Sequence, residues 1–312
     1  MVSFATLLLS GFLTFVELNC ENLFDCRHDS LKDDTEFLPN SGRQWTPRRY
    51  WRKLDNIGRT ILSSTPDAVS YQLPDLVALV EVENDSVLND LTHRSLLRNA
   101  GYEYVMTCSP DVRGVDVALL YQPAMFKVLC YETIEIPLLK DMRPTRDILY
   151  IKGVTQQQDT LHVFVLHAPS RYGGELKSRP FRRQVATTLL AFMEGWQAQH
   201  VVVAGDFNDY FDSASLRLYE EHGLANLTRK AKGCHGAQAT YRYRGEWQSL
   251  DHVLASPSLA AKADTAFIND APFLLEDEMR YGGVRPKRTF QGFRYQQGFS
   301  DHLPLVVKFN FR

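Results

Sequence analysis

Val201-Val202-Val203-Ala204-Gly205-Asp206-Phe207-Asn208-Asp209 is the most informative stretch of this 312-residue chain. Its β-branched start predicts a buried strand that ends at a glycine turn. Asp206 and Asn208 follow two residues apart, so both side chains leave the strand end on the same side. This arrangement suits the positioning of a metal ion or a water molecule, although a plain Asx turn after a strand has the same sequence.

Short apolar runs bounded by polar turns recur along the chain, with helical patterns between them. The alternation of strand and helix favours a layered α/β arrangement over an all-β one. Because neither an internal repeat nor a Pro/Gly-rich linker divides the chain, residues 12–312 are expected to form one domain. The predicted strands are Phe12–Leu18, Leu76–Glu81, Val115–Tyr121, Leu161–Leu166, His200–Ala204, Leu250–Ala255 and Leu303–Phe309, and the predicted helices are Arg48–Ser63, Ser86–Ala100 and Phe181–Gln197.

Composition and charge narrow the class of protein. The chain is 44% hydrophobic and carries a formal net charge of -2, so it has no overall positive field to attract polyanions. These values disfavour a dedicated non-specific nucleic-acid binder but leave room for an enzyme with a local basic cleft. Five scattered cysteines without a CxxC pair favour neither a disulfide framework nor a zinc ribbon.

The N-terminus and two polar stretches fit the strand and helix pattern less well. Residues 1–11 are apolar enough to suggest a signal remnant, with a disordered start as the alternative, although no Lys or Arg precedes the apolar segment and Glu17 interrupts it. The protein is therefore expected in the cytoplasm, or exported if a signal is present, and no membrane span is expected. Arg27–Tyr50 and Pro272–Gly298 read as long loops, which we expect to border a cleft.

Four other predicted strands begin or end near a polar residue that can bind a cation or transfer a proton. Each has a structural alternative, such as a helix N-cap acid, a structural histidine or a surface-facing acid. As a set with Asp206 they favour a hard ion, Mg²⁺, Mn²⁺ or Ca²⁺, and the cleavage of a phosphate ester. These residues are Glu81, His167, Asp251 and the pair Asp301-His302.

Six ordered motifs resemble those of the endonuclease/exonuclease/phosphatase superfamily, which includes DNase I-like and AP-endonuclease-like metal-dependent phosphoesterases. The resemblance implies a four-layer α/β sandwich, with two packed mixed β-sheets flanked by helices, and hydrolysis of a phosphoester by an in-line water. The motifs are Leu18-Asn19-Cys20-Glu21-Asn22-Leu23-Phe24, Val80-Glu81-Val82-Glu83, His167-Ala168-Pro169-Ser170, Gly205-Asp206-Phe207-Asn208, Ser249-Leu250-Asp251-His252 and Ser300-Asp301-His302-Leu303-Pro304.

The resemblance also implies roles for individual residues. At the metal end it places Asn19 and Glu81, with Glu21 as an additional ligand and Asp301 assisting. Asp206 would orient or deprotonate the attacking water, and Asn208 would hold the phosphate. The two histidines would be catalytic: His302, oriented by Asp251, would contact the scissile phosphate or act as an acid–base group, and His167 would be the second.

One segment departs from the family pattern. Many members have a tyrosine just before a Gly-Val-Ala strand, whereas this chain has Arg113-Gly114-Val115-Asp116. We expect Arg113 to bind phosphate and Asp116 to orient His167, with a surface ion pair between them as the alternative.

The substrate is expected to be a phosphoester, with DNA and RNA as candidates, and the protein to be a nuclease-like phosphodiesterase and a monomer. A phosphatase or a lipid or inositol phosphoesterase is the alternative, and a non-catalytic binding module is a third reading. Arg171 is expected on the rim of the cleft, where it would bind a second phosphate. Arginines and aromatic residues interleave in Tyr241–Trp247 and Phe290–Tyr295, where they would stack bases, grip a sugar ring or pack a loop.

Overall fold

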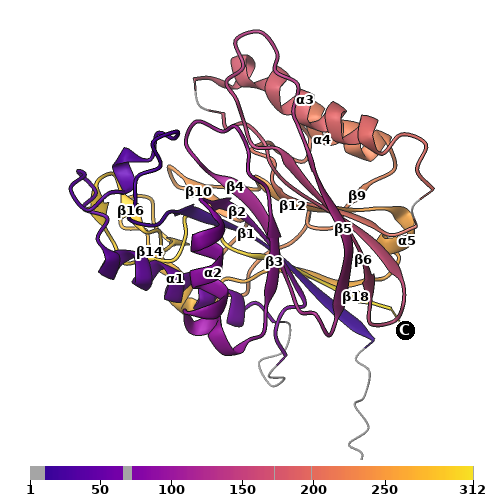
Figure 1. Ribbon diagram of the computed structural model, residues 1–312, viewed down its shortest axis with the longest axis horizontal. Helices are drawn as coiled ribbons and strands as arrows, with labels where there is room; N and C mark the ends of the chain where they lie inside the picture. Colours follow the sequence, from indigo (N-terminus) through magenta and orange to yellow (C-terminus); the bar gives the residue numbers. More distant parts are fainter. Residues whose placement is uncertain (1–10, 66–71, 172, 198, 312) are drawn as a thin grey trace, which may run out of the picture.

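The computed structural model describes residues 11–65, 72–171, 173–197 and 199–311. Two six-stranded sheets form its centre (Figure 1). The expectation for residues 1–11 falls, apart from Gly11, outside the described residues. In spatial order the first sheet is β13 (Ala263–Ile268), β18 (Leu305–Asn310), β1 (Phe12–Leu23), β2 (Leu76–Val82), β4 (Asp116–Tyr121) and β3 (Glu103–Met106), and the second is β5 (Phe126–Ile134), β6 (Ile148–Thr155), β7 (Thr160–His167), β8 (Val201–Asp206), β12 (Asp251–Ala255) and β9 (Ala225–Asn226).

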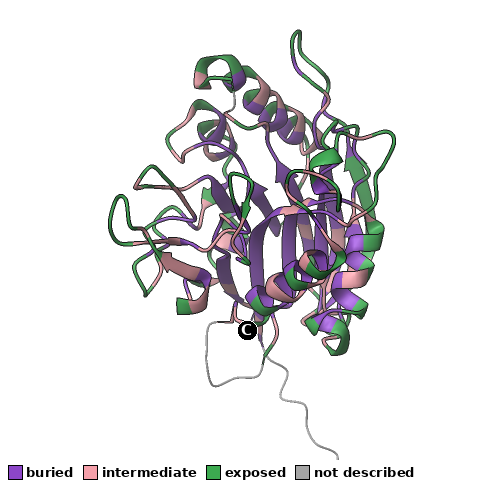
Figure 2. Ribbon diagram, turned by 90° about the vertical axis from the view of Figure 1, so that its left-hand side faces the viewer, coloured by how far each residue is buried: buried purple, intermediate pink, exposed green. Residues whose placement is uncertain are grey.

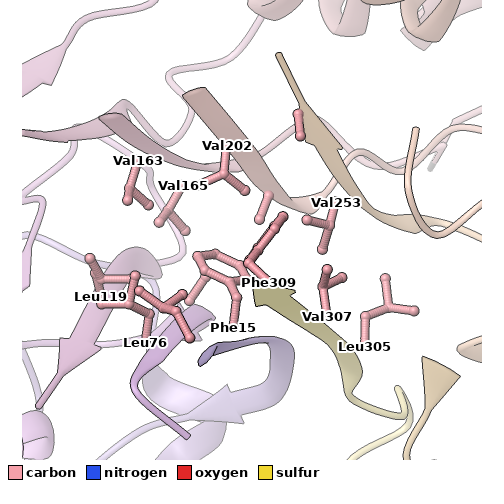
Figure 3. Packing of buried hydrophobic residues seen from close by; sticks show 14 of the residues in the cluster. Phe15, Leu76, Leu119, Val163, Val165, Val202, Val253, Leu305, Val307 and Phe309 are labelled. Carbon is pink, nitrogen blue, oxygen red and sulfur yellow. The ribbon is translucent and has the colours of Figure 1, made fainter. Parts of the chain in front are cut away.

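An apolar core fills the space between the two sheets. Alternate residues of a strand face opposite sides, so Phe15 of β1 points to the other sheet while Val16 points outward to the helices. Figure 3 shows Phe15 and Leu119 of the first sheet facing Val163 and Val202 of the second. Burial of these side chains is the main force that holds the sheets together.

Helices cover both outer faces of the sheet pair. Leu54, Ile57 and Ile61 repeat at helical spacing along α1 and are buried against the first sheet. Figure 2 shows the buried strands in the middle and the exposed outer faces of the helices around them. The four-layer α/β sandwich predicted from the sequence is therefore confirmed. The helices are α1 (Pro47–Leu62) and α2 (Asp85–His93) on the first sheet, α3 (Glu175–Phe192) and α4 (Ala214–Glu221) on the second, and the short α5 (Pro257–Ala260).

Strand direction brings the predicted site residues to one edge of each sheet. Parallel strands end at the same edge of a sheet, and β7 and β8 are parallel with His167 opposite Asp206. The antiparallel β12 starts at that edge, with Asp251 opposite Asp206. β1 and β2 are also parallel, with Asn19 opposite Val80, next to Glu81.

All seven predicted strands are present, but two predictions need correction. Ser86–Ala100 is not one helix, because α2 ends at His93 and a separate 3-10 turn spans Leu96–Asn99. The Ser95 side chain caps that turn by accepting a hydrogen bond from Leu97 N. Pro272–Gly298 is not one loop. It contains a 3-10 turn, Pro272–Leu274, and the short hairpins β14 (Leu275–Asp277) with β15 (Val284–Pro286) and β16 (Phe290–Gln291) with β17 (Arg294–Tyr295).

Arg27–Tyr50, the other expected loop, contains only a 3-10 turn at Thr35–Phe37 before α1 begins. A further hairpin, β10 (Tyr241–Tyr243) with β11 (Glu246–Gln248), precedes β12. Within the described ranges, no helix is both long and apolar enough to cross a membrane.

Candidate active site

Asp206 lies at the centre of a polar cluster where the edges of the two sheets meet. Its Oδ2 accepts a hydrogen bond from Asn19 Nδ2 of the first sheet at 3.2 Å. Its Oδ1 accepts from the backbone N of Asn208 at 2.8 Å, and Asn208 Nδ2 donates to Ala168 O at 3.1 Å. The Asx turn at Asp206 is thus present, and it fixes the carboxylate against a residue from the opposite sheet.

Gly205 makes this close approach possible. Its φ of +143° is a conformation that L side chains rarely adopt, and a Cβ here would lie 1.8 Å from Leu166 O of the adjacent β7. Glycine is therefore required at this position, and it lets β8 deliver Asp206 to the edge beside His167.

Positive φ angles mark three of the predicted site residues. Glu81 has a φ of +61° and lies at a bulge, where the pairing of β2 with β4 shifts register between Val80 and Val82. Glu21 has a φ of +49° and Asn208 a φ of +50°. This conformation costs a glutamate roughly 1 kcal/mol, whereas an asparagine adopts it at low cost, and strain such as that at Glu81 gathers at functional sites. The bulge turns the Glu81 carboxylate out of the regular strand alternation and toward the cluster.

His167 sits between the two sheets' acids. Its Nε2 lies 3.7 Å from Asp206 Oδ2 and 3.8 Å from Glu81 Oε1. Arg113 Nη2 approaches the same Glu81 oxygen at 3.7 Å. Burial, together with the charges of Arg146 and Arg113, holds the pKa of His167 well below its usual range. The imidazole is therefore neutral at physiological pH.

His302 has the opposite electrostatic environment. Its Nδ1 lies 2.8 Å from Asp251 Oδ2, which also accepts a hydrogen bond from Thr240 Oγ1. Burial alone would lower the pKa of His302, but the charge and hydrogen bond of Asp251 outweigh it and hold the pKa well above its usual range. The ring of Tyr241 lies beside this imidazole, with the centroids 4.8 Å apart and the ring planes tilted by 33°. His302 is therefore a cation at neutral pH.

The acids of the cluster crowd one another in a buried space. Burial and the nearby Asp251 charge raise the pKa of Asp206 from 3.8 to about 7. Glu17 of β1 is fully buried, and burial plus the charges of Asp251 and Asp206 raise its pKa well above the ordinary value. A bound cation would relieve this repulsion.

A hard divalent cation fits the donor set. Potential ligand atoms of Asp206, Asp251 and His302 lie within 4.8 Å of one another, but a protonated His302 has no lone pair for a cation, so this group offers the carboxylate oxygens of Asp206 and Asp251. The side chains of Asn19 and Glu81 at this edge also offer oxygen ligands, which Mg²⁺, Mn²⁺ and Ca²⁺ prefer.

Glu21 and Asp301 lie to one side of this cluster. The Glu21 carboxylate accepts hydrogen bonds from Thr289 N at 2.5 Å and Phe290 N at 3.4 Å, so it holds the C-terminal loop onto β1. Arg288 joins the two acids, with its Nη2 2.7 Å from Asp301 Oδ2 and its Nε 3.5 Å from Glu21 Oε1. The Glu21 carboxylate thus binds the backbone of the C-terminal loop and forms an ion pair with Arg288.

The expectation that Asp116 orients His167 is wrong. Asp116 is buried, and its Oδ1 accepts hydrogen bonds from Thr107 Oγ1, Ser109 N and Ser109 Oγ. His167 Nδ1 is buried and has no hydrogen-bond partner among the described residues. The neighbouring strand and loop hold the Asp116 carboxylate, so it does not orient His167.

Arg171 lies away from the cluster as well. Its Nε donates to Glu175 Oε2 at 3.2 Å, and its guanidinium lies 4.4 Å from the centroid of the Tyr210 ring. Glu175 also accepts from Arg179 and Arg182, so Arg171 belongs to an ion-pair network at the start of α3.

Several residues at the site were not foreseen from the sequence, among them Glu17, Tyr241, Thr240 and Arg146. Thr240 supports Asp251, and Arg146 is buried with its Nη2 donating to Ala168 O at 2.9 Å, beside His167. A threonine before an aromatic run carries no signal of its own. A buried arginine is rare enough to mark a site, but its burial becomes visible only in the fold.

Comparisons with known proteins agree with this geometry. A family model described as "Endonuclease/Exonuclease/phosphatase family" matches residues 14–310. No curated protein matches the chain.

Solved structures show the same fold at low sequence identity. An endonuclease/exonuclease/phosphatase family protein from Bacteroides thetaiotaomicron is 15% identical, covers 96% of this chain and 98% of its own, and has a TM-score of 0.64. A mannosyl-6-phosphatase from the same organism is 14% identical over 95% and 98%, with a TM-score of 0.61. D. rerio TDP2 complexed with a single-strand DNA product is 17% identical over 96% and 99%, with a TM-score of 0.57.

Proposed function

The chain belongs to the endonuclease/exonuclease/phosphatase family of phosphoester hydrolases, and on this premise we propose that it is a divalent-metal-dependent phosphodiesterase that cleaves nucleic-acid strands. The observation that carries the proposal is the convergence of two histidines on one buried carboxylate, since His167 Nε2 lies 3.7 Å from Asp206 Oδ2 and His302 and Asp206 have potential ligand atoms within 4.8 Å of each other. The surroundings lower the pKa of His167, raise that of His302 and raise that of Asp206 to about 7.

Asp206 is suited to activate the attacking water. Burial and the Asp251 charge raise its pKa to about 7 in the absence of a cation, and a bound cation would lower it, so the carboxylate would be ionised and able to accept a proton near neutral pH. Asn19 Nδ2 and Asn208 N hold its two oxygens in place. The proton of the attacking water would pass to the Asp206 carboxylate as the new P–O bond forms.

The two histidines would serve the phosphate. His302, kept protonated by Asp251, would donate a hydrogen bond to a phosphate oxygen or a proton to the leaving oxygen. The neutral His167 would contact a non-bridging oxygen, and Arg113 would add positive charge near Glu81.

The acids at this edge would hold the divalent cation. Glu81 and Asn19 are the proposed ligands, with Asp206 of the opposite sheet facing them. When bound, such an ion polarises a phosphate oxygen and offsets negative charge in the transition state.

The similar structures support both a monoesterase and a diesterase, because one is named as a phosphatase and another contains a DNA product. We favour the diesterase because arginine- and tyrosine-rich hairpins border Asp301, next to His302. A monoester held entirely in the cluster would have no use for positive charge outside it.

Hydrolysis of a matched pair of substrates tests the proposal. Bis-p-nitrophenyl phosphate is a diester and p-nitrophenyl phosphate is a monoester, and both release the same chromophore. With Mg²⁺ or Mn²⁺ we expect the diester to be the better substrate in kcat/KM and Asp206→Asn to lose at least about a hundredfold in rate. The exposed Asp264→Asn is the matched control and should retain the activity. A higher kcat/KM for the monoester would overturn the diesterase reading.

A further inference from the structure

Two short hairpins form a pocket beside the candidate active site. The β10–β11 and β14–β15 hairpins line a cavity of about 530 Å³. Figure 1 shows β10 and β14 on the same side of the molecule as β16. Asp301 is part of the pocket wall, and it is followed directly by His302, so the pocket adjoins the catalytic cluster.

The pocket concentrates positive charge in a chain whose net charge is -2. Only two acids, Glu278 and Asp301, contribute to its lining. Positive charge gathered in a concave surface attracts anions by focusing the field. The arginines of the lining are Arg242, Arg244, Arg280, Arg285 and Arg288.

Three of the arginines build the pocket. Arg242 donates to Gly245 O of its own hairpin and to Gly282 O and Val284 O of the other, so it ties the two hairpins together. Arg285 is held by Glu276 and Glu278 at 2.8 Å each. Arg288 is paired with Asp301 and Glu21, as described above. These contacts fix the shape of the pocket before any ligand arrives.

The other two arginines are exposed and unpaired. Among the described residues, neither the Arg244 nor the Arg280 guanidinium has an ion-pair partner. Each lies beside an exposed tyrosine, with Arg244 5.2 Å from the Tyr243 ring and Arg280 5.1 Å from the Tyr281 ring. Both arginines and both tyrosines line the pocket.

The position of Arg244 is strained. It occupies the turn of the hairpin with a φ of +51°, followed by Gly245 with a φ of +86°. Two-residue turns with positive φ at both positions strongly prefer Asn-Gly, because only Gly and Asn adopt this conformation at low cost. An arginine held at the tip at such a cost indicates a function for its guanidinium.

We propose that this hairpin pocket binds a second phosphate of the substrate, next to the phosphate that is cleaved. Arg244 and Arg280 would hold that phosphate, and Tyr243 and Tyr281 would lie along the nucleoside between the two phosphates. The inference rests on the proposed phosphodiesterase function and specifies its substrate as a nucleic-acid strand that carries a neighbouring phosphate. A guanidinium forks onto a phosphate with two parallel hydrogen bonds, and a tyrosine face stacks on a base regardless of its identity.

Two chromogenic substrates that differ by one phosphate test the inference. They are the p-nitrophenyl phosphodiesters of thymidine monophosphate and of thymidine bisphosphate, assayed with Mg²⁺ or Mn²⁺. We expect the wild-type protein to prefer the bisphosphate ester by about tenfold in kcat/KM, and Arg244→Gln/Arg280→Gln to reduce that preference to about one. The preference should also weaken with added salt in the wild-type protein.

A matched double variant controls for the loss of two positive charges. Arg183 and Arg217 are exposed on α3 and α4 and do not line the pocket, so Arg183→Gln/Arg217→Gln should keep the full preference. Equal kcat/KM for both esters in the wild-type protein would overturn the inference, as would a preference that survives Arg244→Gln/Arg280→Gln. Hydrolysis of neither ester would instead count against the phosphodiesterase function, so the two failures are distinguishable.

Discussion

Replacement of Asp206 by asparagine should inactivate the protein and, without metal, make it more stable at alkaline pH. The reason is that the fold forces this carboxylate into a buried space next to Asp251, which raises its pKa from 3.8 to about 7. Between pH 3.8 and about 7, Asp206 is therefore mostly protonated in the folded protein and mostly ionised in the unfolded chain. The stability present below pH 3.8 is lost as the pH rises through about 7.

The size of the effect follows from the pKa difference. At pH 8 the buried carboxylate lowers the free energy of unfolding by at most about 4 kcal/mol, and at pH 5 by less than about 2 kcal/mol. An asparagine side chain has one acceptor oxygen, so either Asn19 Nδ2 or Asn208 N loses its acceptor, at a cost of about 1–2 kcal/mol. We therefore expect Asp206→Asn to be about 2 kcal/mol more stable than wild type at pH 8 and nearly equal to it at pH 5.

Urea unfolding in EDTA, followed by circular dichroism at the two pH values, measures the difference. Raised carboxyl groups away from the site, such as Asp75, change both proteins alike and cancel from the comparison, whereas removal of the Asp206 charge also lowers the pKa of Glu17 and adds to the gain at pH 8. Asp264→Asn, on the exposed side of β13, should follow wild type at both pH values. A variant that is less stable than wild type at pH 8, or a difference that does not grow with pH, would refute the electrostatic account of this site.

Three further outcomes are expected. Asp251→Asn should lower the pKa of His302, because the charge that keeps the imidazole protonated is removed. The alkaline limb of the pH–rate profile should then move to lower pH, and turnover should fall by at least about a hundredfold. An alkaline limb that does not move would show that the protonation of His302 does not control the rate. His167 should be neutral at neutral pH, so nitrogen NMR should show one protonated and one unprotonated ring nitrogen, and two protonated ring nitrogens would contradict its burial beside Arg146. Gly205→Ala should destabilise the fold by several kcal/mol in thermal unfolding, since its Cβ would strike Leu166 O, whereas Gly195→Ala, which meets no atom within 4 Å, should cost far less.

The strand ends were predictable from the sequence because their signal is local. A β-branched run such as Val201–Val203 ends at a glycine, and the acid that follows can be placed at a sheet edge without knowledge of the fold. The seven strands followed from this pattern, and the four-layer class followed from the resemblance of the ordered motifs to a known family.

Contacts between distant segments were not predictable in the same way. Val80-Glu81-Val82 reads as continuous alternation, and the bulge at Glu81 appears only once β4 pairs with β2 and Asn22 N donates to the Glu81 carboxylate. The capture of Asp116 by Thr107 and Ser109 likewise depends on how the loop before β4 folds back.

The hairpin pocket shows the same limit. The alternation in Tyr241–Trp247 and the Arg244-Gly245 turn are local features of a hairpin. Its partner hairpin lies some forty residues further along the chain, and the backbone carbonyls that Arg242 binds carry no side-chain signal. A sequence pattern that encodes side-chain types cannot reveal a contact made by main-chain atoms.

The dependence of bis-p-nitrophenyl phosphate hydrolysis on Mg²⁺ concentration, measured in wild type and in Glu81→Gln, tests the central claim most directly. The strained Glu81 bulge directs this carboxylate toward Asp206 and His167, where it is proposed to hold the cation. We predict no turnover in EDTA, saturable recovery with Mg²⁺ in wild type, and a shift of at least about tenfold to higher Mg²⁺ in the variant. Full turnover in EDTA, or the same Mg²⁺ dependence in both proteins, would contradict a metal-dependent phosphoesterase at this site.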